Sequence, residues 1–322
     1  MGTCVMIPLK GISIFLIVTA AGLAHTGAAA GDCAALVKNF ERAVAKKSID
    51  GVRRAAGDIA EDIVCGEAAE QFGAKYVAFL ITLAEDPSTS LTEQKKALAA
   101  AEERTIISGT WKTAATIGDA YLRLGERASA FDWYERSLSF LKSRPGTPAT
   151  LADKRALLLK ASAAKSFENE DLPTQNQWLR STRGLDGRIE GMYLSGLIRE
   201  VEVLSVPLPV RFFTNESRLT PDGDAAVKEL SDAANEQALK ILKLVGHADP
   251  RGTAEHNLEL SRRRVEAVRD RLKQLGVEAQ IEVSWEGSQQ PFDTSVLPYK
   301  PSQQEIWALD RRVEWVRGGA AD

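Results

Sequence analysis

The sequence predicts an all-α N-terminal region followed by an α+β C-terminal domain in which helices pack on a small mixed sheet. Residues 31–180 are rich in Ala, Leu, Glu and Lys, and their apolar residues recur three and four positions apart, as on one face of a helix. Residues 205–317 instead alternate short apolar strands with helical stretches. Residues 181–204 are interrupted by glycines and read as a connector. A length of 322 residues suits about two domains.

The first thirty residues predict export. Lys10 ends a short n-region, and residues 11–24 form an apolar run of 14 residues. That run is shorter than the roughly 20 residues needed to span a bilayer. Ala28, Ala29 and Ala30 then offer a small-residue cleavage site. Residues 1–30 are therefore predicted to be a signal peptide that sends the protein to the periplasm or cell envelope. Cleavage against retention, and association with the outer membrane, stay open.

The overall composition excludes several classes of partner. The chain has 41 basic and 44 acidic residues, a net charge of −3, so its charge balance indicates neither nucleic acid nor an anionic lipid surface. Three His and three Cys leave little material for a metal site. We expect no metal and no cofactor.

Two cysteines remain after removal of the signal peptide, and we expect them to form a disulfide. Cys33 begins one predicted helix and Cys65 closes the next, with residues 47–50 as the turn between them. The two ends of an antiparallel helix hairpin lie side by side, near the ~5.5 Å Cα separation that a disulfide requires. An exported protein meets an oxidising compartment. The alternative is a pair of inert buried thiols.

One helix pair in the N-terminal region, residues 111–145, resembles a tetratricopeptide repeat. Small residues permit two helices to approach closely, and aromatic residues fill the groove beside them. The positions that carry this resemblance are Gly118, Tyr121, Gly125, Ala130 and Tyr134. Neighbouring segments do not repeat the pattern, so an unrelated helical array is the alternative. Either kind of array usually presents a groove to a protein partner, here an envelope protein that the sequence does not identify.

The C-terminal elements are predicted from their caps and breaks. A strand is expected near residues 203–213, at a sheet edge because of Pro207 and Pro209. Thr220 and Pro221 suit the N-cap and first position of a helix that runs to about residue 236. The later elements are a strand at 241–245, a helix at 254–274 closed by Gly276, a strand at 279–285, a short helix, and a strand at 312–316.

A composite motif lies where the second strand passes into the long helix. Residues 246–252 read Gly-His-Ala-Asp-Pro-Arg-Gly, and Asn257, the pair Leu260-Ser261 and Arg264 follow. This order resembles the OmpA C-terminal domain family over about residues 202–317. Flanking matches are 213–215, 276–277 and 311–314. Ala248 replaces a usual Thr, and Asp310 stands where Asn commonly precedes the Arg pair. The added carboxylate of Asp310 could pair with a nearby arginine and retune the site, and its effect stays open.

The residue chemistry of the motif suits a zwitterionic ligand. Asp249 lies in a loop after a strand, and Asn257 and Arg264 project along one line of the helix because they are seven residues apart. We expect this line at the edge of a buried stripe formed by Leu258, Val265, Val268 and Leu272. A carboxylate can then hold an ammonium while a guanidinium grips a carboxylate with two donors.

The resemblance implies a specific ligand. In the family, the residues that match Asp249 and Arg264 hold meso-diaminopimelate of the peptidoglycan stem peptide. The predicted site is completed by Asn257, Leu260 and Asn215, with Arg311 and Arg312 as additional contacts. The alternative is structural: Asp249 caps the helix and Arg264 is a surface charge.

Catalytic readings lack the necessary residues. No Ser or Cys nucleophile motif accompanies His247 and Asp249, and His256 has no second His at metal-binding spacing. The sequence therefore predicts an envelope protein that binds peptidoglycan non-covalently, with a helical region for protein interaction, and not an enzyme. The alternative is a periplasmic adaptor of tetratricopeptide type whose wall domain only localises it.

Overall fold

A computed structural model of the chain describes residues 29–62, 65, 69–144, 148–166, 205–208, 210–213 and 215–316. The predicted connector at 181–204 and nearly all of the predicted signal peptide lie outside these residues. The chain divides into two compact units, 1–72 and 73–322, which are described separately. Among the described residues, no helix combines the length and the apolar character that a membrane span requires.

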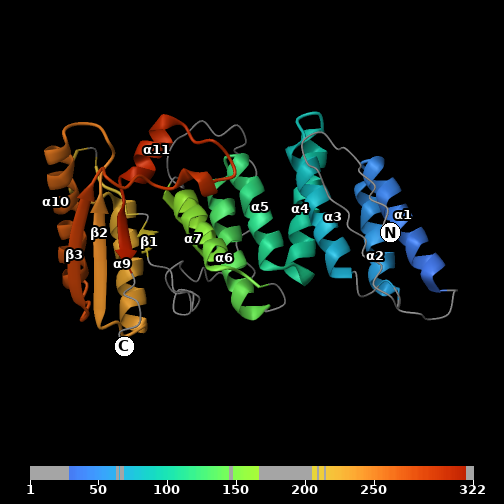
Figure 1. Ribbon diagram of the computed structural model, residues 1–322, viewed down its shortest axis with the longest axis horizontal. Helices are drawn as coiled ribbons and strands as arrows, with labels where there is room; N and C mark the ends of the chain where they lie inside the picture. Colours follow the sequence, from blue (N-terminus) through green and yellow to red (C-terminus); the bar gives the residue numbers. More distant parts are fainter. Residues whose placement is uncertain are drawn as a thin grey trace, which may run out of the picture. The chain divides into compact units, whose positions relative to one another are not determined.

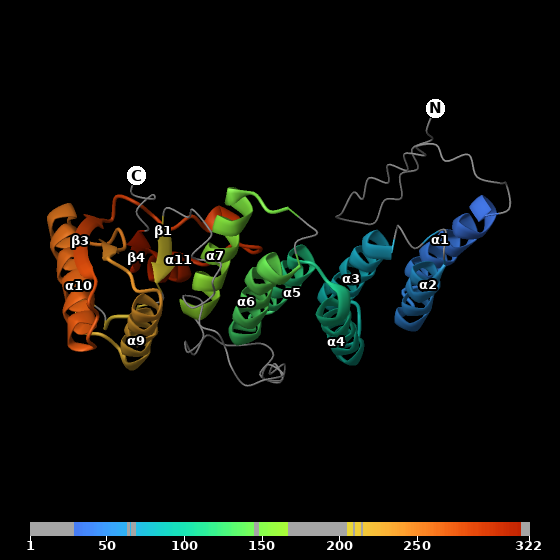
Figure 2. The ribbon, with the colours of Figure 1, turned by 90° about the horizontal axis from the view of Figure 1, so that it is seen from below.

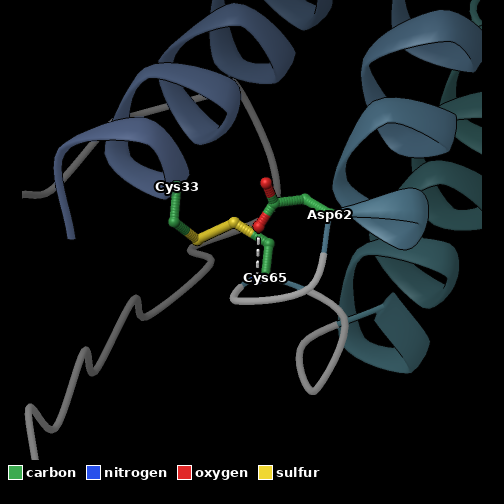
Figure 3. Close-up of a disulfide and its surroundings, with 3 residues drawn as sticks. All are labelled: Cys33, Asp62 and Cys65. Atoms are coloured by element: carbon green, nitrogen blue, oxygen red, sulfur yellow. Dashed lines mark hydrogen bonds between the residues drawn. A yellow bond between two sulfur atoms is a disulfide. The ribbon is translucent and has the colours of Figure 1, made fainter. Parts of the chain in front are cut away.

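The first unit is built around a helix hairpin. Helix α1 (Ala29–Ala45) and helix α2 (Ile49–Glu61) contact each other, and Ser48 caps α2 by accepting a hydrogen bond from the Gly51 amide. Cys33 and Cys65 form the predicted disulfide, with their Cα atoms 5.5 Å apart (Figure 3).

The second cysteine lies outside the helix that it was predicted to close. Helix α2 ends at Glu61, and Cys65 occupies a turn beyond it. Asp62 fixes that turn, because its Oδ1 accepts a 2.8 Å hydrogen bond from the Cys65 amide (Figure 3). The turn brings the sulfur back toward the start of α1.

The second unit begins with a series of helices. The pair predicted around residues 111–145 is present, and Gly118 permits its close packing: a Cβ there would lie 2.7 Å from Cε1 of Tyr134. Gly125 has a φ of +81°, as the tight turn between the helices requires. The tetratricopeptide assignment itself stays a prediction. The helices are α3 (Ala69–Glu85), which begins in the first unit, α4 (Leu91–Ser108), α5 (Trp111–Arg123), α6 (Arg127–Ser143) and α7 (Leu151–Ser166).

The C-terminal part has the predicted mixed sheet with helices packed on it. The strand order is β1-β4-β2-β3, in which β2 and β3 are parallel and the other two pairings are antiparallel. Strand β1 contains Pro207 and pairs with β4 alone, so its predicted edge position is confirmed. The elements are β1 (Ser205–Leu208), α9 (Pro221–Glu236), β2 (Ile241–His247), α10 (Ala254–Gln274), β3 (Gln280–Gly287), η2 (Thr294–Val296), α11 (Gln303–Asp310) and β4 (Val313–Val316).

The long helix α10 packs on β2 and β3, but its buried face differs in part from the prediction. Val265, Val268 and Leu272 are buried as expected, whereas Leu258 is 41% exposed. The place of Leu258 in the buried face is taken by Asn257, Leu260, Ser261 and Arg264. The motif residues therefore lie within the buried face and not at its edge.

Helix α7 lies between α6 and the edge strand β1, as both views show (Figures 1 and 2). It also contacts α11 and η2. The helical series and the C-terminal sheet are therefore packed together within the second unit.

Candidate ligand-binding site

Asp249 follows the end of β2 and is held by two arginines. Arg251 forms a two-pronged ion pair with its carboxylate, with Nε 2.8 Å from Oδ1 and Nη2 2.9 Å from Oδ2. Arg311 Nη1 donates to Oδ2 at 3.1 Å. Burial acts to raise the pKa of Asp249, but the hydrogen bonds from Arg251 and Arg311 outweigh it and lower this pKa to about 2. The carboxylate is therefore ionised at neutral pH.

The proposed capping role of Asp249 is wrong. The N-cap of α10 is Thr253, whose hydroxyl accepts a hydrogen bond from the His256 amide at 3.2 Å. Gly252, with a φ of +94°, turns the chain between Asp249 and this cap. The side chain of Asp249 therefore does not cap α10.

Arg264 is a buried cation and not a surface charge. The residue is 1% exposed; its Nε donates to the Glu216 carbonyl at 3.1 Å, and the guanidinium lies 5.2 Å from the centre of the Phe212 ring. Its Nη1 has no hydrogen-bond partner among the described residues. Burial, with the nearby charge of Arg311, lowers the pKa of Arg264 to about 10. A buried donor without an acceptor is costly, so this atom points to a ligand.

Asp249 and Arg264 are near each other but not bonded. The negative charge of Asp249 acts to raise the pKa of Arg264, so the two groups interact electrostatically. The hydrogen bonds of Asp249 go to Arg251 and Arg311 instead. The two predicted ends of the site thus exist as separate charged groups.

The other predicted residues divide between buried and exposed positions. Asn257 and Leu260 are 3% and 5% exposed on the inner face of α10. Asn215 is exposed and has a φ of 57°, and the next residue, Glu216, supplies the carbonyl that Arg264 binds. That carbonyl and Arg251 were missed by the sequence reasoning. A charged residue two positions after Asp249, in the same turn, was the available signal for Arg251.

Arg312 continues the pattern of buried arginines. Its Nε donates to Glu314 Oε1 at 2.6 Å, its Nη2 donates to the Gln290 carbonyl at 3.2 Å, and its Nη1 has no partner among the described residues. Asp310 forms no hydrogen bond with an arginine among the described residues. Oδ1 of Asp310 instead accepts a 2.8 Å hydrogen bond from the Phe292 amide, which fixes the loop before α11.

His247 is not arranged as a catalytic base. It is 1% exposed, and its Nε2 lies 3.8 Å from Oε1 of Glu314. Burial lowers the pKa of His247 to about 4, so the imidazole is neutral at physiological pH. Within the described part of the chain, no group of three His, Cys, Asp or Glu side chains gathers as a metal site would.

A cleft of about 180 Å³ joins these arginines. Its walls include Arg264, Arg311 and Arg312 from the C-terminal domain, together with Ser162 and Ser166 from α7. With Arg211, four arginines line this small cleft, and they favour an anionic ligand or ligand group.

Comparison with known proteins assigns the C-terminal part to a family. The model of the OmpA family matches residues 211–304. Over 126 residues the chain is 31% identical to the peptidoglycan-associated lipoprotein of Pseudomonas putida, which covers 38% of this chain and 69% of that protein. The chain belongs to the OmpA family.

The OmpA-like part is shared with larger proteins as well. The chain is 32% identical over 115 residues to outer membrane porin F of Pseudomonas aeruginosa, but spans only 31% of that relative's length. That match covers 35% of this chain. The crystal structure of the peptidoglycan-associated lipoprotein from Burkholderia pseudomallei matches 39% of this chain and 97% of that chain, with 26% identity and a TM-score of 0.29.

Proposed function

We propose that this chain is a cell-envelope protein that binds peptidoglycan non-covalently through its OmpA-like domain, by holding the diaminopimelate of the stem peptide. The observation that carries the proposal is the buried Arg264, which lines the cleft and whose Nη1 has no acceptor among the described residues. Two relatives of the OmpA-like domain are named peptidoglycan-associated lipoproteins, which supports the choice of ligand. Residues 205–317 are proposed to form the wall-binding domain.

The carboxylate of the ligand would bind Arg264. An ion pair with Arg264 would fill the vacant donor at Nη1 and neutralise a charge that burial disfavours. Charge-assisted hydrogen bonds are about twice as strong as neutral ones. The guanidinium is already fixed by Glu216 and Phe212, so binding costs little side-chain entropy.

The ammonium of the ligand would bind Asp249. Arg251 is the more exposed of the two arginines on this carboxylate, with a side chain that is 50% exposed against 29% for Arg311. An incoming ammonium could therefore take the place of Arg251 while Arg311 stays. Arg251 would then remain over the Trp307 ring, 4.5 Å from its centre.

For the helical region we propose binding to a protein partner in the envelope. Its large apolar side chains are mostly buried, but Leu91, Ile107 and Leu151 are exposed. The adaptor alternative assigns the main function to this region and leaves the OmpA-like domain to localise it. Sacculus binding that persists without any captured protein would favour the wall-binding role over the adaptor role.

Co-sedimentation with purified sacculi and calorimetry with the tripeptide L-Ala-γ-D-Glu-meso-diaminopimelate test the proposal. Arg264→Lys keeps the charge but loses the two-pronged grip, so we expect at least a tenfold loss of affinity. Arg262→Ala is the matched control on the same helix, because Arg262 only pairs with the exposed Glu259 and with Glu266. Equal binding by both variants would refute the site.

A further inference from the structure

The cleft beside Arg264 is built from two regions of the chain. Arg264 and Arg312 come from the OmpA-like domain, whereas Ser162 and Ser166 come from the last turns of α7. Ser162 is buried and Ser166 is half-buried. The helical region therefore supplies one wall of the cleft and two hydroxyl groups to it.

Two guanidinium nitrogens of this cleft are unsatisfied. Arg264 is 1% exposed and Arg312 is 7% exposed, and the Nη1 atom of each has no partner among the described residues. Native proteins leave few buried donors unpaired, because each costs about 1–3 kcal/mol. Both arginines line the same cleft, and an anion with at least two acceptor oxygens is the ligand that would satisfy both donors.

A buried contact holds the helical region in place beside the cleft. Arg127, the first residue of α6, pairs with Glu305 of α11 at 2.6 Å and donates to Tyr299 Oη at 2.8 Å. The side chains of Arg127 and Glu305 are only 12% and 10% exposed. Tyr299 completes the triangle by donating to Glu305 Oε1 at 3.0 Å. Because this contact is well shielded from solvent, its Coulomb attraction is screened less than that of an exposed ion pair.

We propose that the cleft is a composite carboxylate-binding site, in which helix α7 completes the arginine wall of the OmpA-like domain. The hydroxyls of Ser162 and Ser166 would donate to a carboxylate that lies between Arg264 and Arg312. Peptidoglycan binding and the docking of the helical region are then coupled, because the ligand contacts both. The choice of a peptidoglycan carboxylate rests on the proposed function; the composite site does not.

A charge placed on α7 tests the composite site in the full-length exported protein. Ser166→Asp puts a carboxylate on the wall of the cleft, and Ser143→Asp is the matched control. Each serine ends its helix, so the unfavourable interaction with the helix dipole is common to both variants. We expect Ser166→Asp to weaken tripeptide binding at least tenfold in calorimetry, and Ser143→Asp to change it less than twofold.

A second pair of variants tests the coupling without touching the cleft. Arg127→Ala removes the buried contact to Glu305 and Tyr299, and we expect a several-fold loss of tripeptide affinity. Arg123→Ala is its control, because Arg123 pairs with Glu85 inside the helical region. Unchanged affinity in Arg127→Ala would overturn the coupling.

Malonate separates failure of this inference from failure of the proposed function. As a small dicarboxylate, it should raise the melting temperature of the unmodified protein and of Ser143→Asp, but not of Ser166→Asp. If malonate stabilises while the tripeptide does not bind, the peptidoglycan proposal fails and the composite site stands. If Ser166→Asp binds both probes as Ser143→Asp does, or if malonate has no effect on any form, the composite site is refuted.

Discussion

Replacing Arg264 by methionine should make the free protein more stable while it abolishes ligand binding. Methionine has a similar length and fills the same buried volume without a charge. Burial lowers the pKa of Arg264 well below its usual value, to about 10. At about 1.36 kcal/mol for each pKa unit, the charged form costs the folded state about 3 kcal/mol. The arginine is thus retained at the expense of stability.

The methionine variant also loses favourable contacts. The hydrogen bond from Nε to the Glu216 carbonyl contributes about 1–2 kcal/mol, and Glu216 is exposed, so water can replace the lost donor. The contact with the Phe212 ring contributes about 0.5 kcal/mol. We therefore expect a net stabilisation of about 1 kcal/mol, which corresponds to a rise of roughly 2–4 °C in melting temperature for a domain of this size.

The pH dependence gives an independent check. The folded-state pKa of Arg264 lies below its unfolded value, so the cost of its charge is fully present below about pH 10 and fades as pH rises toward the unfolded-state pKa. The advantage of Arg264→Met should therefore be constant from pH 6 to pH 9. Thermal unfolding in this range and calorimetry with the tripeptide are the measurements.

The control is Arg262→Ala, which removes exposed ion pairs that contribute little to stability and leaves the cleft intact. A methionine variant that melts below Arg262→Ala would show that Arg264 stabilises the fold. A variant that binds the tripeptide like the unmodified protein would show that Arg264 is not a ligand residue. Either result would refute the reasoning.

Three further predictions concern other parts of the chain. Replacing Cys33 and Cys65 by serine should lower the stability of the α1–α2 unit to urea by about 3 kcal/mol, because the bond closes a loop across a separation of 32 residues. Gly246→Ala should cost about 1–3 kcal/mol in thermal unfolding, since its Cβ would lie 2.4 Å from the Ser261 carbonyl oxygen. Tripeptide affinity should be constant between pH 5 and pH 7 in calorimetry, because the pKa of Asp249 is about 2 and its charge is complete above pH 4.

Each of these predictions has a contrasting outcome. Free thiols in freshly prepared exported protein, read as two additional hydrogens by mass spectrometry, would contradict the disulfide. Gly57→Ala is the control for Gly246→Ala, because an added methyl group there meets nothing within 4 Å. Equal losses of stability in the two glycine variants would show that the contact of Gly246 with Ser261 does not explain the loss. A tenfold change in affinity across the pH window would mean that another group titrates in the site.

The order and type of the C-terminal elements could be predicted because local chemistry specifies them. Thr220 caps α9, and Pro221 follows at its first position, as the residue types alone require. Gly276 ends α10 with a φ of +82°, a conformation that suits glycine. The exposure of Leu258 could not be predicted from periodicity. The backbone of α10 approaches Gly287 so closely at this residue that main chain, and not the leucine side chain, fills the contact.

The identity of the charged residues at the site was predictable, but their pairing was not. Arg311 reaches Asp249 across 62 positions in sequence, and Arg127 reaches Glu305 across 178. Such contacts depend on how finished elements pack, which no spacing rule encodes. Asp310 shows the same limit: its buried carboxylate binds a backbone amide and not one of the neighbouring arginines.

The two ends of the proposed site have different energetics in the free protein. Asp249 has both oxygens occupied by Arg251 and Arg311, so a ligand ammonium exchanges one cation for another and gains little net energy. Arg264 lines the cleft and has a buried donor without a partner among the described residues, so a ligand carboxylate adds a contact that these residues do not supply. The arginine end should therefore provide most of the affinity. The aspartate end should instead select ligands that carry an ammonium. A ligand without an ammonium cannot displace Arg251, so both oxygens of the Asp249 carboxylate stay paired with arginines. A zwitterion satisfies both conditions, which explains why one helix and one loop carry opposite charges that do not bond to each other.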